Sequence, residues 1–556
     1  MKRVFSVFII FSLAIFTIIN YNISNNNIKV LEYPKFIAQD RPFGENLVNI
    51  PTKNCVAMLN SLDLSLIIKE KRDEISNYSS EEICRLGNME SFITFGDLDG
   101  DYLSEVMFLD NRGIISLYWN TGGGYKRDNY LSDMLSKYVV NNKNKGIFFF
   151  MDANNDKLND IIFSPNSNRN ELLIISNKGE RKFEVESPIS YKGDVMIDQV
   201  PTNVTTDDIN KDGLADIIFT ISGNVNYPVR IFSSNIDKDI SYNEVTSNLF
   251  LDNYNIKDLN LFNNTTLVND FNLDGKLDLF IAGLYSSNFY ISKDNKFILD
   301  KSNSIEGRLV GASLSDYNED GLLDIIATDN SSESKGLVVL LANKNNNFKK
   351  IRSIYNNSLE SATGFINMDF NMDGYNDFFI GNNVLDYKNI GYEERNLLRP
   401  YILLGDERSL IDETGEIFRS LLMIETVSNI ASTDFNGDFK PDILLASNEM
   451  AKPHMILNSS KGSNKAAAIL IKGKGAGGSP LNGEGAIITI KIKDRPVQKF
   501  KLPSKISNYN SYSATAPIII GLGENQEALI DVLFPSGINI KGKIFKDKVN
   551  IIKEVA

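Results

Sequence analysis

The stretch DFNLDGKLDLFIAG, residues 270–283, decides the fold of this chain. It opens with a nine-residue acidic pattern that has Asp270, Asn272, Asp274 and Asp278 at positions 1, 3, 5 and 9, and it continues into an apolar run typical of a β-strand. The pattern occurs seven times, starting at Asp97, Asp152, Asp208, Asp270, Asp316, Asp369 and Asp434. The start-to-start spacings of 55, 56, 62, 46, 53 and 65 residues indicate a structural repeat.

Strand-like runs surround every copy of the pattern. One apolar run follows it directly, a second comes after a turn, and a third precedes it, as in GIFFFM at residues 146–151. Short β-rich runs with a period near 50 residues are typical of propeller blades of about four strands. We therefore predict an all-β fold with a seven-bladed β-propeller over residues 89–458. The last blade lacks an outer strand, which the segment 29–38 could supply.

The spacing of the acids points to a metal. In a tight loop the oxygens at positions 1, 3 and 5 converge, position 7 adds a backbone carbonyl, and position 9 adds a carboxylate from the start of the next strand. A flexible shell of oxygen ligands suits calcium best. Position 12 is apolar in every copy, where an EF-hand needs Glu, so an EF-hand is excluded and each loop should connect two strands.

The sequence thus predicts Ca²⁺ as the cofactor. The predicted ligands are Asp97, Asp99, Asp101, Glu105, Asp152, Asn154, Asp156, Asp160, Asp208, Asn210, Asp212, Asp216, Asp270, Asn272, Asp274, Asp278, Asp316, Asn318, Asp320, Asp324, Asp369, Asn371, Asp373, Asp377, Asp434, Asn436, Asp438 and Asp442. The alternative for any one copy is an Asp- and Asn-rich turn that binds nothing.

Position 6 of the loop should have a positive φ, which favours glycine. The four middle loops have glycine there, whereas Tyr102, Lys157 and Phe439 take that place in the first, second and last loops. Glu105 also replaces Asp at position 9 of the first loop. We therefore expect distorted or weaker sites in these three loops.

Composition and charge exclude several classes of protein. The 556 residues include 58 Lys and Arg against 71 Asp and Glu, a formal charge of −13, which argues against a nucleic-acid partner. Residues 459–556 carry +8, which leaves −21 for the rest and indicates two domains with different roles. With one histidine, His454, and two cysteines, a Cys/His zinc site is excluded and haem or iron–sulfur ligation is not expected.

The N-terminus resembles an export signal. Lys2 and Arg3 precede an apolar run over residues 4–19, and no small-residue cleavage site follows. Residues 1–24 thus fit a cleaved signal peptide or a retained anchor helix that attaches the chain to a membrane, with a buried core helix as a third interpretation. We expect an exported protein, whether periplasmic, cell-surface or secreted. In an oxidising compartment Cys55 and Cys84 would form a disulfide, the alternative being two buried free thiols.

Two family resemblances add to this interpretation. Over residues 91–458 the loops resemble the FG-GAP/VCBS repeats of integrin-alpha-like β-propellers, which implies calcium between the first two strands of each blade and seven blades. The stretch 483–537 resembles the ASPIC/UnbV domain that follows such propellers in the cartilage acidic protein family. Its matching elements are Gly485-Ala486, Ser511 to Ser513, a Gly521-Leu522-Gly523 turn and Phe534 to Gly537, although Ile520 and Phe534 replace the family's aromatic residue and tryptophan.

These observations divide the chain into four parts. Residues 1–24 are the signal or anchor, 25–88 an N-terminal segment with a short helix over 54–71, 89–458 the propeller, and 459–556 a small β-sandwich or barrel-like domain. The leading hypothesis is a non-enzymatic, monomeric binding module for an extracellular protein or polysaccharide. The alternative is a calcium-assisted lyase or glycosidase that acts on extracellular polysaccharide.

Overall fold

The computed structural model describes residues 36–39, 92–109, 115–122, 124–138, 146–164, 171–186, 189–190, 200–222, 227–235, 241–250, 263–283, 286–331, 336–344, 348–355, 362–382, 400–406, 410–412, 427, 429–446, 454–458, 460, 462–502, 505–507 and 510–555. These residues lie in antiparallel sheets almost throughout, which confirms the all-β prediction. Two short helices, α4 (Asn129–Ser136) and α5 (Thr246–Leu249), accompany the sheets in the described part.

Seven antiparallel groups of strands follow one another in the described residues up to Asn458. Group 1 contains β2 (Phe92–Gly96), β3 (Glu105–Leu109), β4 (Ile115–Asn120) and β5 (Tyr125–Asp128); group 2 contains β6 (Ile147–Met151), β7 (Asp160–Ser164) and β8 (Glu171–Asn177), with β9 (Phe183–Val185) and β10 (Ile189–Ser190) paired to β8. Group 3 contains β11 (Val200–Asp207), β12 (Asp216–Ser222), β13 (Val229–Asn235) and β14 (Ser241–Glu244); group 4 contains β15 (Asn263–Asn269), β16 (Asp278–Gly283), β17 (Ser286–Lys293) and β18 (Lys296–Glu306).

The remaining groups repeat this order. Group 5 contains β19 (Leu309–Ser315), β20 (Asp324–Asp329), β21 (Gly336–Ala342) and β22 (Phe348–Tyr355); group 6 contains β23 (Ala362–Met368), β24 (Asp377–Asn382), β25 (Tyr401–Gly405) and β26 (Leu410–Asp412). Group 7 contains β27 (Asn429–Thr433), β28 (Asp442–Ala446) and β29 (His454–Asn458). Its fourth strand is β1 (Phe36–Gln39), which pairs antiparallel with β29, so a segment from ahead of the first loop completes the last group.

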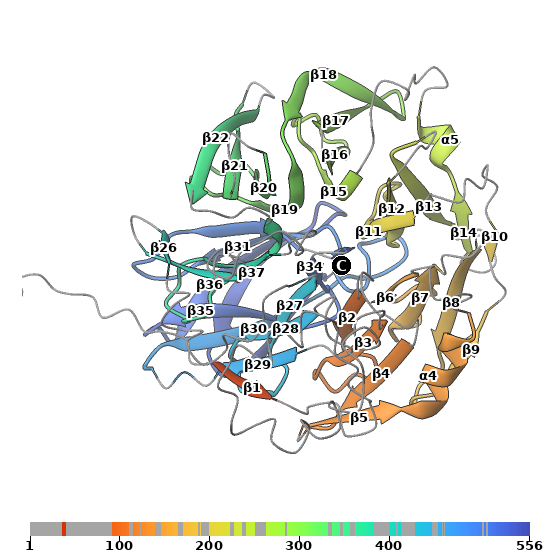
Figure 1. The fold of residues 1–556 in the computed structure, drawn as a ribbon, viewed down its shortest axis with the longest axis horizontal. Helices are drawn as coiled ribbons and strands as arrows, with labels where there is room; N and C mark the ends of the chain where they lie inside the picture. Colours follow the sequence, from red (N-terminus) through yellow and green to blue (C-terminus); the bar gives the residue numbers. More distant parts are fainter. Residues whose placement is uncertain are drawn as a thin grey trace, which may run out of the picture. The chain divides into compact units, whose positions relative to one another are not determined.

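The first strands of the seven groups form a closed ring. β2 contacts β6, and the contacts continue through β11, β15, β19, β23 and β27 back to β2. Figure 1 shows the groups following one another around a common centre, which is the arrangement of a β-propeller.

The hydrophobic core lies between neighbouring groups. Phe108 of β3 packs in one cluster with Leu444 of β28, and Phe280 of β16 packs in another with Ile325 of β20. All four side chains are buried, and each contributes about 1.5–3 kcal/mol by leaving water. Because each group buries its apolar faces against both neighbours, the ring is stabilised group by group.

The C-terminal region, residues 462–555, adds one three-stranded sheet and extends sheets of the ring. Its strands are β30 (Lys465–Lys472), β31 (Ile487–Lys491), β32 (Gln498–Lys501), β33 (Lys505–Ser507), β34 (Asn510–Tyr512), β35 (Ile518–Gly523), β36 (Glu527–Leu533), β37 (Asn539–Phe545) and β38 (Val549–Lys553). The sheet β35-β30-β38 and the strands β32-β31-β36-β37, which continue the sheet of group 5, share one apolar cluster that includes Ile469 and Ile530. The segment Gly521 to Gly523 ends strand β35, so the prediction of a turn there was wrong.

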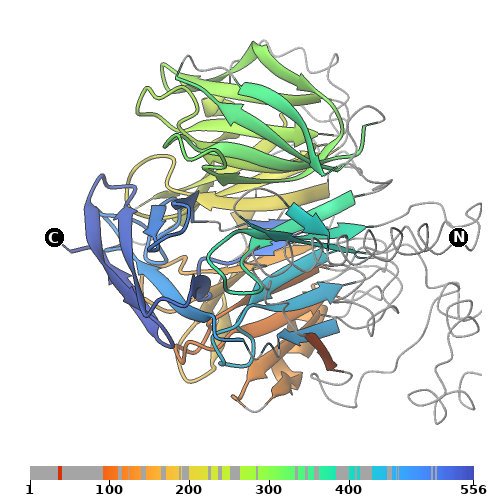
Figure 2. The ribbon, with the colours of Figure 1, turned by 90° about the vertical axis from the view of Figure 1, so that its left-hand side faces the viewer.

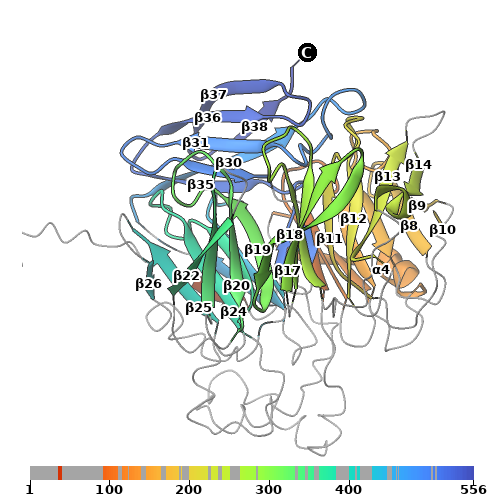
Figure 3. The ribbon, with the colours of Figure 1, turned by 90° about the horizontal axis from the view of Figure 1, so that it is seen from above.

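This region pairs directly with the ring. β33 pairs with β11, β34 pairs with β27, and β32 reaches β19 through Ser315 and Phe500. Figures 2 and 3 show β30, β31, β36 and β37 lying across one end of the ring. Residues 34–556 accordingly form one compact unit.

Several predictions fall on residues outside the described ones. These are the apolar run 4–19, the helix over 54–71, and the Cys55–Cys84 disulfide. In the part of the chain that the structure describes, neither helix has the length and apolar character needed to cross a bilayer.

Candidate metal centres

Each acidic loop connects the first and second strands of its group. Loop 1 starts at Asp97 and joins β2 to β3, and loops 2 to 7 join the corresponding strands of the other groups. The residue at position 9 is the first residue of the second strand in every group, as in Asp278 of β16. A strand therefore fixes the last predicted ligand of each loop, while the tight turn before it positions the others.

All seven loops share one backbone conformation. Positions 4 and 6 have φ between +58° and +93° in every loop, including Tyr102 at +69°, Lys157 at +76° and Phe439 at +63°. The three loops without glycine at position 6 thus adopt the same turn as the others. The residues at position 6 of these three loops carry backbone strain, because residues with a Cβ disfavour a positive φ.

Within a loop the acids hold the turn through backbone amides. In loop 4, Asp270 accepts hydrogen bonds from the N–H of Asp274 at 3.0 Å and of Gly275 at 2.8 Å, and Asp274 accepts one from Lys276 at 2.9 Å. The bond from position 6 to position 1 and the bond from position 7 to position 5 recur in all seven loops. The structure therefore brings positions 1 and 5 together around one turn.

The Asn at position 3 joins the same cluster in loops 3 to 6. Its side-chain amide donates to the second oxygen of the Asp at position 5, at 2.9 Å between Asn210 and Asp212 and 3.1 Å between Asn272 and Asp274. The same contact measures 3.1 Å in loop 5 and 3.2 Å in loop 6.

The carboxylate at position 9 fastens each loop to two strands. In loop 4, Asp278 accepts hydrogen bonds from Phe271 N–H at 3.0 Å and from Ser292 N–H, in the third strand β17, at 2.7 Å. Both bonds recur in every loop. Position 9 is fully buried in all seven: Glu105, Asp160, Asp216, Asp278, Asp324, Asp377 and Asp442.

Burial disfavours the charged form of these acids. Loss of solvation raises the pKa of Glu105 to about 9, of Asp160 to about 7, and of Asp278 to about 6. It raises the pKa of Asp216 and Asp324 to about 6 and that of Asp377 and Asp442 well above the ordinary value. The neighbouring acids of the same loop raise most of these pKa values further. The ionised form of each of these position-9 acids is therefore one that a nearby cation would stabilise.

Loop 1 places three carboxylates closest together. Oxygens of Asp97, Asp99 and Glu105 all lie within 4.8 Å of one another, and the Oδ1 atom of Asp99 is buried without a hydrogen-bond partner. The other oxygen of Asp99 accepts from Arg181 at 2.6 and 3.0 Å. The Arg181 guanidinium lies 4.5 Å above the ring of Trp119, so a side chain of group 2 supplies the one cation contact described for this loop. The donor set, buried oxygens with a free lone pair, fits a hard cation such as calcium.

The C-terminal region contacts the same loops. Lys499 donates to the Gly321 carbonyl of loop 5 at 2.5 Å, and Arg495 donates to the Asp373 carbonyl of loop 6 at 2.5 Å. Gly477 N–H donates to the Asp212 carbonyl of loop 3 at 2.8 Å. The sequence pattern identified neither the contacts between the C-terminal region and the loops nor the role of Arg181. The opposite net charges of the C-terminal region and the rest of the chain were a signal for those contacts.

Comparisons with known proteins give distant likenesses. No protein-family model and no curated protein matches the chain. A lectin structure from Agrocybe aegerita that describes recognition of non-reducing terminal N-acetylglucosamine is 16% identical, with a TM-score of 0.39, and covers 67% of this chain and 91% of its own. BBS1N in complex with ARL6DN is 9% identical, with a TM-score of 0.36, and covers 68% of this chain and 95% of its own. AofleA from Arthrobotrys oligospora is 10% identical, with a TM-score of 0.30, and covers 58% and 84%. At these values the likenesses carry no argument about function.

Proposed function

We propose that the chain is an exported, calcium-binding β-propeller of seven blades, of the FG-GAP/VCBS type with a C-terminal ASPIC/UnbV-like domain, and that it acts as a non-catalytic binding module. Each of the seven strand groups is one blade in this proposal. The residues at positions 1, 3, 5 and 9 of loops 1 to 7 hold the calcium.

One observation carries the calcium assignment. Every loop ends on a carboxylate that is fully buried, and the acids at positions 1 and 5 lie in the same turn. Buried carboxylates are costly in their charged form unless a cation accompanies them. Calcium, when bound, would supply that charge and accept oxygen ligands without demanding a strict geometry.

The hydrogen bonds also favour a structural role over catalysis. The acids at positions 1, 5 and 9 each accept backbone N–H bonds, so these oxygens shape the loops. A general acid or base must instead present its oxygen to a substrate. The loops thus serve as rigid elements that fix the ends of the blades.

Metal analysis tests the calcium assignment. The full chain would be purified in calcium, freed of unbound metal and measured for bound calcium by mass spectrometry, then titrated with calcium or magnesium after chelation. We expect several calcium ions per chain and a clear preference for calcium over magnesium. A chain without bound metal that takes up neither ion would contradict the assignment.

A binding assay tests the role. The full chain, immobilised in calcium, would be incubated with neutral and acidic polysaccharides, and both retention and released fragments would be scored. Retention without fragments supports a glycan-binding module, and no retention with no fragments directs the search to a protein partner. Released fragments would contradict the non-catalytic role and favour the polysaccharide-active enzyme. Fractionation of the producing cells tests export.

A further inference from the structure

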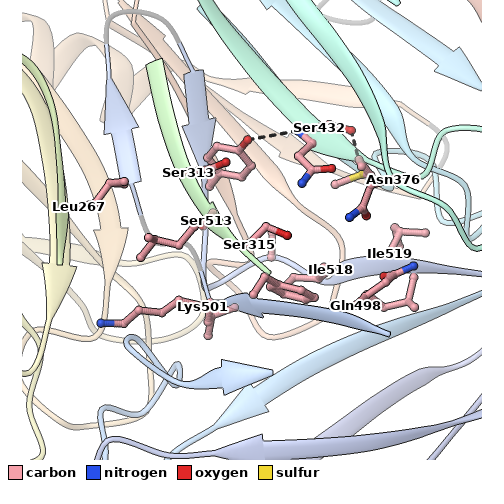
Figure 4. Close-up of a pocket in the computed structure, with 18 of the residues that line it drawn as sticks. Leu267, Ser313, Ser315, Asn376, Ser432, Gln498, Lys501, Ser513, Ile518 and Ile519 are labelled. Atoms are coloured by element: carbon pink, nitrogen blue, oxygen red, sulfur yellow. Dashed lines mark hydrogen bonds between the residues drawn. The ribbon is translucent and has the colours of Figure 1, made fainter. Parts of the chain in front are cut away.

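Loop 1 receives a cation from the neighbouring group of strands. At the axis of the ring the C-terminal region supplies the cation instead: Lys501 pairs with Asp207, and both line the central cavity. This cavity is a space of about 140 Å³ where side chains of six first strands meet β32, β34 and β35 (Figure 4). In loop 1 the cation is Arg181, from the turn between β8 and β9 of group 2. The electrostatics of loop 1 therefore depend on a contact between two groups of the ring.

Loop 1 carries one more acid than the other loops at the predicted ligand positions. Asp99 stands at position 3, where loops 2 to 7 have Asn, so loop 1 has four acids at positions 1, 3, 5 and 9 and each other loop has three. In loops 3 to 6 the side-chain amide at position 3 donates to the carboxylate at position 5. An ionised carboxylate has no proton to donate, so Asp99 needs a partner of another kind.

Arg181 is that partner, and its guanidinium is held in a defined place. Its Nε and Nη2 atoms donate to one oxygen of Asp99 at 3.0 and 2.6 Å, and the group lies 4.5 Å from the ring centroid of Trp119. The Trp119 ring is only 4% exposed, and its Nε1 donates to Asp128 at 2.9 Å. Because the Asp99 side chain is 16% exposed, the two charges interact more strongly than they would in open solvent.

Further hydrogen bonds hold group 2 against loop 1. The side-chain amide of Asn177 donates to the Leu98 carbonyl at 2.7 Å, and that of Asn159 donates to the Asp97 carbonyl at 2.6 Å. Arg181 itself has φ +60°, a conformation that residues with a Cβ disfavour. The turn accepts this strain while it places the guanidinium beside Asp99.

We propose that Arg181 sets the calcium affinity of loop 1 by compensating the extra charge of Asp99. The inference rests on the calcium binding proposed above. Oxygens of Asp97, Asp99 and Glu105 lie within 4.8 Å of one another, so Asp99 belongs both to the acid cluster and to the ion pair. With its four acids ionised, the ligand set of loop 1 carries −4, and Arg181 brings the sum to −3, the value of each other loop. The same positive charge repels a cation that these acids bind, so it lowers the affinity of the loop.

Terbium titration of the full chain tests this role. Tb³⁺ takes oxygen ligands as Ca²⁺ does, and its luminescence is excited through a nearby tryptophan. Trp119 is the only tryptophan of the chain, so excitation of tryptophan reports on ions beside it. The share of the signal that Asp101→Ala removes belongs to loop 1, and competition by calcium against that share gives the calcium affinity. We expect Arg181→Gln to raise this affinity about tenfold, because a like charge beside the ion is removed.

Two further substitutions separate local compensation from a change of overall charge. Lys182→Gln is the matched control: Lys182 lies in the same turn, is 70% exposed and pairs with Glu180 at 2.6 Å, so its loss should leave the affinity unchanged. Asp99→Asn should lower the affinity about tenfold. Asp99→Asn combined with Arg181→Gln should return it to within about threefold of the wild-type value, because the ligand set again carries −3.

The outcomes distinguish this inference from the proposed function on which it rests. An unchanged or lowered affinity in Arg181→Gln, in a chain that still binds calcium, would overturn the role of Arg181 alone. Equal gains in Arg181→Gln and Lys182→Gln would overturn it as well, since overall charge would then explain the effect. A chain that binds neither terbium nor calcium at any loop would overturn the proposed function, and this inference with it. Total bound calcium, measured by mass spectrometry on each variant, separates these cases.

Discussion

The ammonium group of Lys501, in the C-terminal region, forms a buried ion pair with the carboxylate of Asp207 at the end of β11. Lys501 also donates to the Val268 carbonyl of β15 at 2.9 Å. The side chains of Lys501 and Asp207 are 8% and 4% exposed, and the two residues are 294 positions apart in the sequence. The pair therefore connects the C-terminal region to β11 and β15 at a place that is largely buried.

Removing one partner of this ion pair should lower the stability of the fold. We expect Lys501→Met to lower the free energy of unfolding by about 3–5 kcal/mol, because Asp207 would remain buried without its counter-ion. Lys541→Met is the control, since Lys541 pairs with Asp531 at 3.2 Å while 72% exposed and should change stability by less than about 1 kcal/mol. Urea denaturation measures both. Equal losses would show that the buried pair has no special role.

A single position-9 acid should matter for both metal and stability. Asp278→Asn replaces a fully buried carboxylate that accepts two backbone N–H bonds. We expect the bound calcium to fall by about one ion per chain and stability to fall by about 1–3 kcal/mol.

The control for this substitution is Asp133→Asn. It makes the same charge change at a side chain that is 73% exposed and lies 3.7 Å from Arg127. Calcium content and thermal unfolding should stay at the wild-type values there. An Asp278→Asn variant that retained its full calcium content would remove this residue from the predicted ligands.

The pH dependence of stability should reverse when calcium is removed. The folded pKa of Asp160 is about 7 and that of Asp278 about 6, above the value of roughly 4 for an unfolded Asp. Between these values the folded chain binds more protons, so without metal its stability is fully present below about pH 4 and is lost as pH rises through about 6 to 7.

Bound calcium requires the ionised acids, so the loaded chain should gain stability over the same range. Melting curves at about pH 5 and about pH 8, each with calcium and with chelator, measure both slopes. Chelated protein that melts higher at the higher pH would contradict the role of burial in these pKa values.

Substitutions at two loop glycines distinguish the effect of backbone strain on stability from the effect of contacts with the C-terminal region. Gly275 has φ +86° and open space around its missing Cβ, so Gly275→Ala should cost about 1–2 kcal/mol from strain alone. Gly213 has φ +88°, and a Cβ there would lie 2.5 Å from the Gly475 carbonyl oxygen and 2.7 Å from Gly478 N. Gly213→Ala should therefore cost clearly more. Equal losses by denaturation would mean that the turn at 475–478 does not pack on loop 3.

The sequence predicted the acidic loops because their ligands repeat at fixed spacing. Position 9 was expected at the start of a strand, and Glu105, Asp160 and Asp278 indeed begin β3, β7 and β16. The missing strand after Asn458 pointed to residues 29–38, and β1 begins within that segment. These features follow from local patterns, so a single sequence is enough to find them.

Other features needed three-dimensional information. Leu273 and Met372 adopt positive φ at position 4, which no property of leucine or methionine favours. The contact of Arg181 with Asp99 and the pair of Lys501 with Asp207 join residues far apart in the chain. The central cavity combines side chains of six blades with the C-terminal region, so no local pattern marks it.

Thermal unfolding of the full chain with calcium and with an excess of chelator, at neutral pH, tests the central claim most directly. If calcium neutralises the buried acids of the loops, chelation should lower the melting temperature by at least about 10 °C, and added calcium should restore it. Identical melting curves in calcium and in chelator would contradict the account, because the buried carboxylates would then be stable in the fold without a metal.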